Sequence, residues 1–351
     1  MDTGARYFRP FYGFLLVFAV LTALTTRLEA ADVCVDDVSD GAADALDCDA
    51  DCSDPSPDCS LRDAIDKAGT GDRIFFDPSL SGNSIGLTEG NYLISSDLTI
   101  EGPGSGNFTI SGADDFQIFN LQATVQISGL KMINGRNDGI GGCVFISGSG
   151  NVTLDDVIVT NCEIATSGSA GGAGIYNEGS LTITNSTIRD SKLALGSSGS
   201  IVGGGIQNTG SLTIRNSSIF GNVAQLGGGI FSGGSTASLI LDKVSVTTNI
   251  SQANDSGGGG IAVSGAGSSA VLTNVTFSGN VAFGTNTIGG GISVNNQGHA
   301  TLIHCTLAEN AADNGGNIGN FNNGTATLVN TLIANDTEGG GCVGDVTNDG
   351  G

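Results

Sequence analysis

One pattern of apolar and polar positions repeats along the chain from residue 141 onward. Each repeat has a short apolar segment after a run of glycines, then an alternating stretch such as residues 181–184 (LTIT), and then a third short segment such as residues 187–188 (TI). Alternation with a period of two predicts strands that bury one face. Because no repeat contains an amphipathic helical stretch, we predict a solenoid built of strands alone.

The repeats align on one position in the glycine run, and successive copies are 31, 31, 24, 31, 31 and 26 residues apart. A unit of this size cannot bury its own inner face, whereas stacked units can. The aligned residues are Cys143, Gly174, Gly205, Gly229, Gly260, Gly291 and Asn317. Stacking them predicts an aliphatic ladder formed by Ile183, Ile214, Leu241, Leu272, Leu302 and Leu328.

Glycine and asparagine recur where the coils must turn. Glycine tolerates the positive φ angles and close backbone contacts that sharp turns require. Asparagine recurs at one predicted corner, where we expect stacked amides to hydrogen-bond from coil to coil. The residues at that corner are Asn185, Asn216, Asn274 and Asn330, with Asp156, Lys243 and His304 interrupting.

The part of the chain before residue 141 continues the pattern less regularly. Residues 98–102, 108–110 and 125–129 predict strands of about two earlier coils, for about nine coils in all. Ser60 is a good N-cap for a helix over residues 60–69, and Asp63 completes a variant of the capping box. We predict that this helix covers the open end of the solenoid, which would otherwise expose unpaired strand edges.

Residues 1–30 have the features of a secretory signal. Arg6 and Arg9 precede an apolar run at residues 11–24, and cleavage is predicted after Ala30. The run is short for a transmembrane anchor and no second span follows, so no integral membrane span is expected in the mature chain. We therefore divide the chain into a signal peptide (1–30), an acidic Cys-rich cap (31–70), a parallel β-helix (71–338) and a C-terminal tail (339–351). The predicted location is secreted, either extracellular or at the outer cell surface.

Composition narrows the classes of partner. The chain has 58 Gly, no Trp and a formal net charge of −23. A nucleic-acid-binding surface needs clustered Lys and Arg, so no nucleic-acid partner is expected. Cysteines of an exported protein form disulfides more often than zinc sites. The disulfide candidates are the four cysteines of the cap: Cys34, Cys48, Cys52 and Cys59.

The cap also carries ten Asp and no Lys or Arg between residues 32 and 58. Asp47, Asp49 and Asp51 have the spacing that begins a calcium-binding loop, and Asp58 stands at a later ligand position. Cys52 stands where such loops need Gly, so a solvated, disulfide-linked cap is the preferred interpretation. Calcium bound by these four Asp is the alternative, and no other cofactor is expected.

Residues suited to polysaccharide cleavage are sparse in the sequence. Asp155 and Asp156 could act as acid and base, but neighbours in a strand point to opposite faces. Asp190, one coil later, is the further carboxylate that could approach. The cations Arg136, Arg189, Arg215 and Lys243 look scattered rather than clustered, and the two histidines, His299 and His304, look structural, so no catalytic residue is predicted.

A third class of function is binding to ice or another ordered surface. A row of threonines alternates outward beside the aliphatic ladder: Thr182, Thr213, Thr273, Thr301 and Thr327. β-Propensity on a solvated face explains this row without a ligand. That is the preferred interpretation.

Residues 59–65 (CSLRDAI) resemble the CSLREAI motif that opens a family of secreted bacterial and archaeal β-helix proteins, with Asp63 in place of Glu. Residues 71–78 (GDRIFFDP) resemble that family's first strand. The GGGI repeats, paired with residues 219–222 (IFGN), resemble the GGA(I/L) and FxxN repeats of chlamydial polymorphic outer-membrane proteins. These resemblances cover most of residues 59–338. They imply a right-handed parallel β-helix, displayed at or released from the cell surface and often adhesive, and parallel crossovers favour the same hand.

The sequence thus predicts an all-β, single-stranded right-handed parallel β-helix of about nine coils with a short N-terminal capping helix. The predicted function is structural or adhesive and non-catalytic, with a surface glycan or a protein as partner. A polysaccharide lyase or glycoside hydrolase with this fold is the alternative. Proteins that carry these repeats often end in a barrel or an anchoring domain, and neither is evident before Gly351, so we expect a fragment.

Overall fold

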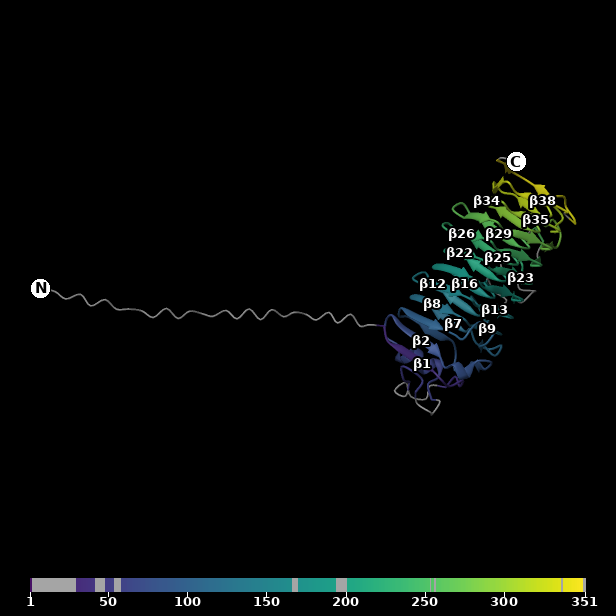
Figure 1. Ribbon diagram of the computed structural model, residues 1–351. Coiled ribbons are helices and arrows are strands. Elements are labelled where there is room, and N and C mark those ends of the chain that lie inside the picture. The colour runs from purple at the N-terminus through teal and green to yellow at the C-terminus, as the bar shows by residue number, and fades with distance from the viewer. Residues whose placement is uncertain are drawn as a thin grey trace.

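The computed structural model describes residues 1, 30–41, 48–53, 58–165, 170–193, 201–252, 254–255, 257–335 and 337–349. Almost all of the predicted signal peptide, residues 2–29, lies outside these residues. The described chain is an elongated stack of coils, with the cap at one end and the C-terminus at the other (Figure 1). Among the described residues, no helix has the length and apolar composition to cross a membrane.

Parallel pairing between successive coils builds three long sheets and one shorter sheet. Sheet A contains β1 (Asp32–Val35), β2 (Asp72–Phe76), β5 (Leu98–Glu101), β8 (Thr124–Ser128), β12 (Asn151–Asp155), β17 (Ser180–Thr184), β22 (Ser211–Arg215), β26 (Ser238–Asp242), β30 (Ser269–Thr273), β34 (His299–Ile303), β37 (Thr325–Val329) and β40 (Val346–Asn348). Sheet B contains β3 (Ser84–Gly86), β6 (Thr109–Ser111), β9 (Lys131–Ile133), β13 (Ile158–Thr160), β18 (Thr187–Arg189), β23 (Ser218–Phe220), β27 (Ser245–Thr247), β31 (Thr276–Ser278), β35 (Thr306–Ala308) and β38 (Leu332–Ala334).

Sheet C contains β4 (Tyr92–Ile94), β7 (Phe119–Leu121), β11 (Val144–Ile146), β16 (Ile175–Asn177), β21 (Ile206–Asn208), β25 (Ile230–Gly233), β29 (Ile261–Ser264), β33 (Ile292–Asn295), β36 (Ile318–Asn320) and β39 (Cys342–Val343). Sheet D contains β10 (Arg136–Asn137), β14 (Glu163–Ile164), β19 (Lys192–Leu193), β24 (Val223–Ala224), β28 (Ile250–Gln252) and β32 (Val281–Phe283). A further pair joins β15 (Ala170–Gly171) to β20 (Ile201–Val202). The parallel β-helix is confirmed; sheets B and C have ten strands each, which corresponds to about ten coils where nine were predicted. Strands β39 and β40 continue the stack past residue 338.

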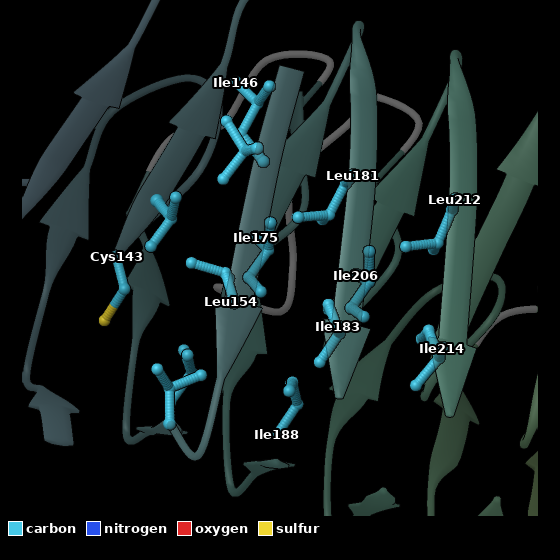
Figure 2. Close-up of a cluster of buried hydrophobic side chains, with 14 of the residues drawn as sticks. Cys143, Ile146, Leu154, Ile175, Leu181, Ile183, Ile188, Ile206, Leu212 and Ile214 are labelled. Atoms are coloured by element: carbon cyan, nitrogen blue, oxygen red, sulfur yellow. The ribbon is translucent and has the colours of Figure 1, made fainter. Parts of the chain in front are cut away.

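The predicted aliphatic ladder forms the core. Ile183 pairs in register with Ile214, and the same column continues through Leu241, Leu272, Leu302 and Leu328. Figure 2 shows Ile183 and Ile214 inside the coils, below a second inward row that includes Leu181 and Leu212. Each fully buried side chain of this size stabilises the fold by about 1.5–3 kcal/mol.

The glycine runs are required by the backbone. Gly203 turns the chain with φ of +70°, a conformation in which a Cβ atom is strained. At the next position, a Cβ atom on Gly204 would lie 2.4 Å from the carbonyl oxygen of Gly228 in the following coil. The coils therefore approach one another too closely here for any larger residue.

The predicted asparagine corner exists, but its backbone explains it better than an amide ladder does. All seven of its residues have φ between +47° and +56°, the left-handed region that asparagine tolerates best after glycine. The backbone N–H groups of all of them except Asn330 are seen to bond to the next coil, as in Asn185 N–H to the carbonyl of Arg215 at 3.2 Å.

A buried amide ladder lies elsewhere, at the asparagine that ends each IFGN-type segment. Asn222 Nδ2 donates to Asn249 Oδ1 at 3.0 Å, and the same bond links Asn249 to Asn280 at 3.1 Å and Asn280 to Asn310 at 2.9 Å. All four side chains are fully buried. Each Nδ2 also donates to a backbone carbonyl, as Asn249 does to Ile219 at 3.0 Å.

The cap adds a strand and a helix to the first coils. Strand β1 pairs with β2, and α1 (Leu61–Lys67) has the predicted capping box between Ser60 and Asp63. A short 3₁₀ helix, η1 (Pro78–Leu80), follows β2. Two disulfides, Cys34–Cys52 and Cys48–Cys59, pair all four predicted cysteines.

A buried charge cluster fixes the cap to the solenoid. Asp40 is 4% exposed and accepts hydrogen bonds from Arg62 Nη2 and from the Tyr92 hydroxyl, both at 2.8 Å. The backbone N–H groups of Thr88 and Glu89 also donate to its carboxylate. The Arg62 guanidinium lies 4.7 Å from the centre of the Tyr92 ring. Arg62 belongs to the CSLRDAI segment, so this arginine has a structural role in the cap.

Replacing Asn249 with Ala should lower the free energy of unfolding by about 3 kcal/mol, because it removes the acceptor of the buried Asn222 N–H groups and the donor to Asn280 Oδ1 and to the Ile219 carbonyl. Thermal or denaturant unfolding measures the change. Ser269→Ala, on the exposed face of β30, is the matched control and should change stability by less than about 0.5 kcal/mol. Equal stability of the two variants would show that the ladder contributes nothing.

The buried Tyr92 side chain should make the stability of the fold depend on pH. Burial, together with the Asp40 carboxylate, raises the pKa of Tyr92 well above its usual value. In the unfolded chain the phenol loses its proton above about pH 10, while in the fold it keeps it, so rising pH favours unfolding. The melting temperature of the wild type should therefore fall more steeply between about pH 9.5 and 11 than that of Tyr92→Phe. Parallel curves would contradict this assignment.

Candidate functional site

A groove lies where the solenoid widens. Sheet D begins at β10, so the two preceding coils pass from sheet B to sheet C without a strand at this side. A hollow of about 530 Å³ opens at this step. It is lined by Asn91, Asp115, Phe116, Gln117, Arg136, Asn137 and Asp138.

A second hollow, of about 220 Å³, adjoins the first along the next coils. The lining residues of the two hollows are neighbours, since Asp114 and Asp115 are consecutive and Arg136 pairs in register with Glu163. The second hollow is lined by Asp114, Asn134, Asn161, Glu163, Asp190 and Lys192. We call the residues of both hollows the charged groove. They carry five carboxylates and two cations, and Arg189 at the rim adds a third.

Charges of opposite sign alternate along the charged groove. Arg136, Glu163 and Lys192 pair in register on consecutive coils, about 4.8 Å apart. Lys192 Nζ lies 3.7 Å from Glu163 Oε2, and Arg189 Nη1 lies 2.6 Å from Asp190 Oδ2. The side chains of Glu163 and Asp190 are 37% and 39% exposed. Ion pairs this open contribute little to stability, so they can exchange partners with a bound molecule.

A glycine leaves room for the Asp190 carboxylate. Gly221 stands at the same position as Asp190 in the next coil, at the corner between sheets B and D, and its φ is +68°. A Cβ atom at Gly221 would lie 2.5 Å from Asp190 Oδ1. The space beside this carboxylate therefore exists only because residue 221 has no side chain.

A third disulfide lies directly beneath the charged groove. Cys162 stands between Asn161 and Glu163, and it pairs with Cys143 of the preceding coil. Both cysteines are fully buried. The bond was missed in the sequence, and it fixes the backbone that presents two groove residues.

The Asp155 and Asp156 carboxylates do not converge. Asp155 accepts from the Thr184 hydroxyl at 2.5 Å and from Asn185 Nδ2 at 2.8 Å, both in the following coil. Asp156 accepts from the Ser105 hydroxyl at 2.7 Å, toward the N-terminal end. Both lie at the corner between sheets A and B, where Asp155 bonds to the next coil and Asp156 bonds to Ser105 two coils earlier.

The interpretation of the cations as scattered was wrong for the groove. Arg136, Arg189 and Lys192 gather with Glu163 and Asp190 within three consecutive coils. The repeat alignment carried the signal, because Arg136, Glu163 and Lys192 each stand two residues after a corner residue of positive φ. The two histidines lie elsewhere: His299 Nδ1 is 2.6 Å from the Thr325 hydroxyl, and His304 belongs to the asparagine corner.

The predicted threonine row is interrupted in the structure. Thr182 and Thr213 share an outward column of sheet A with Thr301 and Thr327, while Ile240 and Val271 stand between them. Thr273 belongs to a neighbouring column. Binding to an ordered surface stays a prediction.

The calcium hypothesis also stays a prediction. Asp47 lies outside the described residues. The Asp49 carboxylate accepts from the backbone N–H groups of Cys52 and Ser53, Asp51 accepts from Ser53, and the Asp58 backbone donates to Asp36. Within the described chain, Cys34, Cys52 and Asp77 are close enough to share a metal, but the two thiols are joined as a disulfide.

No family model and no curated protein matches the chain. Among solved structures, an alginate lyase from Paenibacillus sp. str. FPU-7 is similar over 82% of this chain and 96% of that chain, with a TM-score of 0.31 and 14% identity. A likeness of this size concerns the parallel β-helix fold and identifies no residue of this chain as catalytic.

One prediction is corrected here. The chain was expected to be a non-catalytic structural or adhesive protein because its charged residues looked scattered, whereas the structure gathers several of them in one groove; the solved neighbour, for its part, is named as a lyase. The non-catalytic role has no support among the described residues, where exposed carboxylates and cations instead gather in one groove.

Replacing both Cys143 and Cys162 with Ala should lower the free energy of unfolding by about 3 kcal/mol, because the disulfide closes a 19-residue segment of the unfolded chain. Thermal unfolding without reductant measures the loss. Cys305→Ala removes a buried thiol outside any disulfide and controls for lost packing. An equal effect of the two changes would show that the cross-link itself does not stabilise the fold.

Proposed function

We propose that the protein is a polysaccharide-cleaving enzyme and that the charged groove is its active site. The observation that carries this proposal is the placement of Glu163 and Asp190 on adjacent coils, half-exposed and lining one hollow. Glycoside cleavage requires two carboxyl groups on either side of the scissile bond, about 5 to 9.5 Å apart. Asp190 lies two residues before Lys192, the register partner of Glu163, so the two backbones are about 8 Å apart and their side chains can reach this range.

Five charged residues at the groove have roles in this reaction. One carboxyl protonates the leaving glycosidic oxygen, and the other either activates water or attacks the anomeric carbon. The Arg189 guanidinium holds Asp190 through a charge-assisted hydrogen bond. Lys192 and Arg136 flank Glu163 and can donate hydrogen bonds to sugar hydroxyls. An open groove along the coils suits a chain better than a small enclosed ligand.

Elimination is the second candidate, and one observation favours it. Arg136 and Lys192 stand on either side of Glu163, so they could neutralise the carboxylate of a uronate while Glu163 removes a proton. This reaction releases an unsaturated product, whereas hydrolysis does not.

The proposal includes the location and the relatives of the protein. Three disulfides support an extracellular or cell-surface location, since they persist in oxidising compartments. The predicted secretory signal and the CSLREAI resemblance point the same way. The right-handed sense of the helix is part of the same proposal.

Glu163→Gln and Asp190→Asn should each lower the cleavage rate by about 10²–10⁴-fold, because each removes one acid–base group. Reducing-end release from a panel of polysaccharides detects both reactions, and ultraviolet absorbance of unsaturated products identifies elimination. Asp242→Asn, on the outer face of sheet A, is the matched control and should keep full activity. Wild-type cleavage that both groove variants retain would exclude this site, and no cleavage of any tested polysaccharide would contradict the proposal.

A further inference from the structure

An uncharged surface continues the charged groove toward the C-terminus. Residues 218–226, 245–252 and 276–288 lie on three consecutive coils and contain no Asp, Glu, Lys or Arg. Asp190 and Lys192 bound this surface on one side, and Glu309 bounds it on the other. In a chain with a net charge of −23, three successive segments without a charged side chain are a marked departure, and Asp255, which accepts from Asn286, lies at their edge.

Apolar side chains extend along this surface in direct register with the groove. Lys192 pairs with Val223, Val223 with Ile250, and Ile250 with Val281. Two phenylalanines flank the row, since Phe220 pairs with Arg189 and Phe283 pairs with Gln252. We call Phe220, Val223, Ile250, Val281 and Phe283 the apolar strip.

The phenylalanines are open to solvent at both ends of the strip. Phe283 is 69% exposed, although a large apolar side chain gains about 1.5–3 kcal/mol from burial. Phe220 is half-buried, and its ring lies 5.9 Å from the guanidinium of Arg189, which pairs with Asp190. Glycine occupies positions 221 and 279 at the corner between sheets B and D, with φ of +68° and +63°, so no side chain stands at these two positions.

We propose that the apolar strip binds the sugar rings of a neutral polysaccharide on the C-terminal side of the cleavage site; this inference rests on the proposed function. Sugar rings have apolar faces that pack on aromatic side chains, and an exposed phenylalanine offers such a face. The strip spans about 10 Å from the Val223 coil to the Val281 coil, which accommodates a short stretch of glycan.

The charge of the groove favours a neutral polysaccharide over an acidic one as the ligand of the strip. The charged groove holds five carboxylates against three cations, counting Arg189, so its field repels a polyanion. The strip offers no cation that could compensate. A neutral glycan avoids this repulsion and still presents hydroxyls to the charged groups.

Affinity electrophoresis in gels that contain hydroxyethylcellulose, galactomannan or alginate tests the strip. At least one of the two neutral polymers should retard the wild type, and alginate should not. Phe220→Ala and Phe283→Ala should each weaken retardation by about five- to ten-fold. Leu93→Ala, which removes a 52% exposed side chain from sheet C, should bind as the wild type does. Sedimentation of the same variants shows whether the strip instead joins two copies of the chain.

Four results would overturn the strip proposal: no retardation by any polymer, retardation by alginate alone, full retardation of both Phe variants, or a strip needed only for self-association. Glu163→Gln and Asp190→Asn separate this proposal from the proposed function. They should abolish cleavage and keep retardation. Binding that depends on the strip, without cleavage of any polymer, would contradict the proposed enzymatic function and support the strip proposal. Cleavage by the wild type, with binding unaffected in both Phe variants, would support the enzymatic function and contradict the strip proposal.

Discussion

Hydrogen bonding between parallel strands of successive coils is the constraint on which the structure depends. It places each residue about 4.8 Å from the residue at the same position of the next coil. Inside, this makes a continuous column of Ile and Leu side chains. Outside, like charges in one column would repel each other, and the alternation of Arg136, Glu163 and Lys192 avoids that repulsion.

The sequence was sufficient for the fold because the pattern of the core is periodic. Ile183 and Ile214 stand at the same place in two recognisable repeats, so their pairing could be read before the structure was known. The capping box at Ser60 and Asp63 is a local signal and was equally legible. The roles of the asparagines were harder to predict, because Asn216 and Asn222 recur with the same period. Asn216 adopts φ of +49° at the surface, whereas Asn222 is a buried member of the amide ladder.

The candidate site was missed because its signal lies in the alignment of separate repeats and not in any local motif. Its members are dispersed along residues 114–192, and only the register of sheet D brings Arg136, Glu163 and Lys192 together. Cys143 and Cys162 are 19 residues apart, less than one repeat, so alignment of the repeats does not place them in contact. Asp155 and Asp156 are adjacent in the sequence and therefore suggested a catalytic pair, although their carboxylates bond to different coils.

A solenoid of this kind can acquire chemistry only at outward positions. A polar side chain in the aliphatic column would be buried between apolar side chains of two neighbouring coils and would lose its hydrogen bonds to water. A substitution at an outward position leaves the column intact. The step at β10 adds a second condition, because narrow coils beside wide ones create a hollow that a uniform stack lacks. The charged groove and the apolar strip occupy one outward side from that step onward, which is where a solenoid with a uniform core can differ from its own repeat.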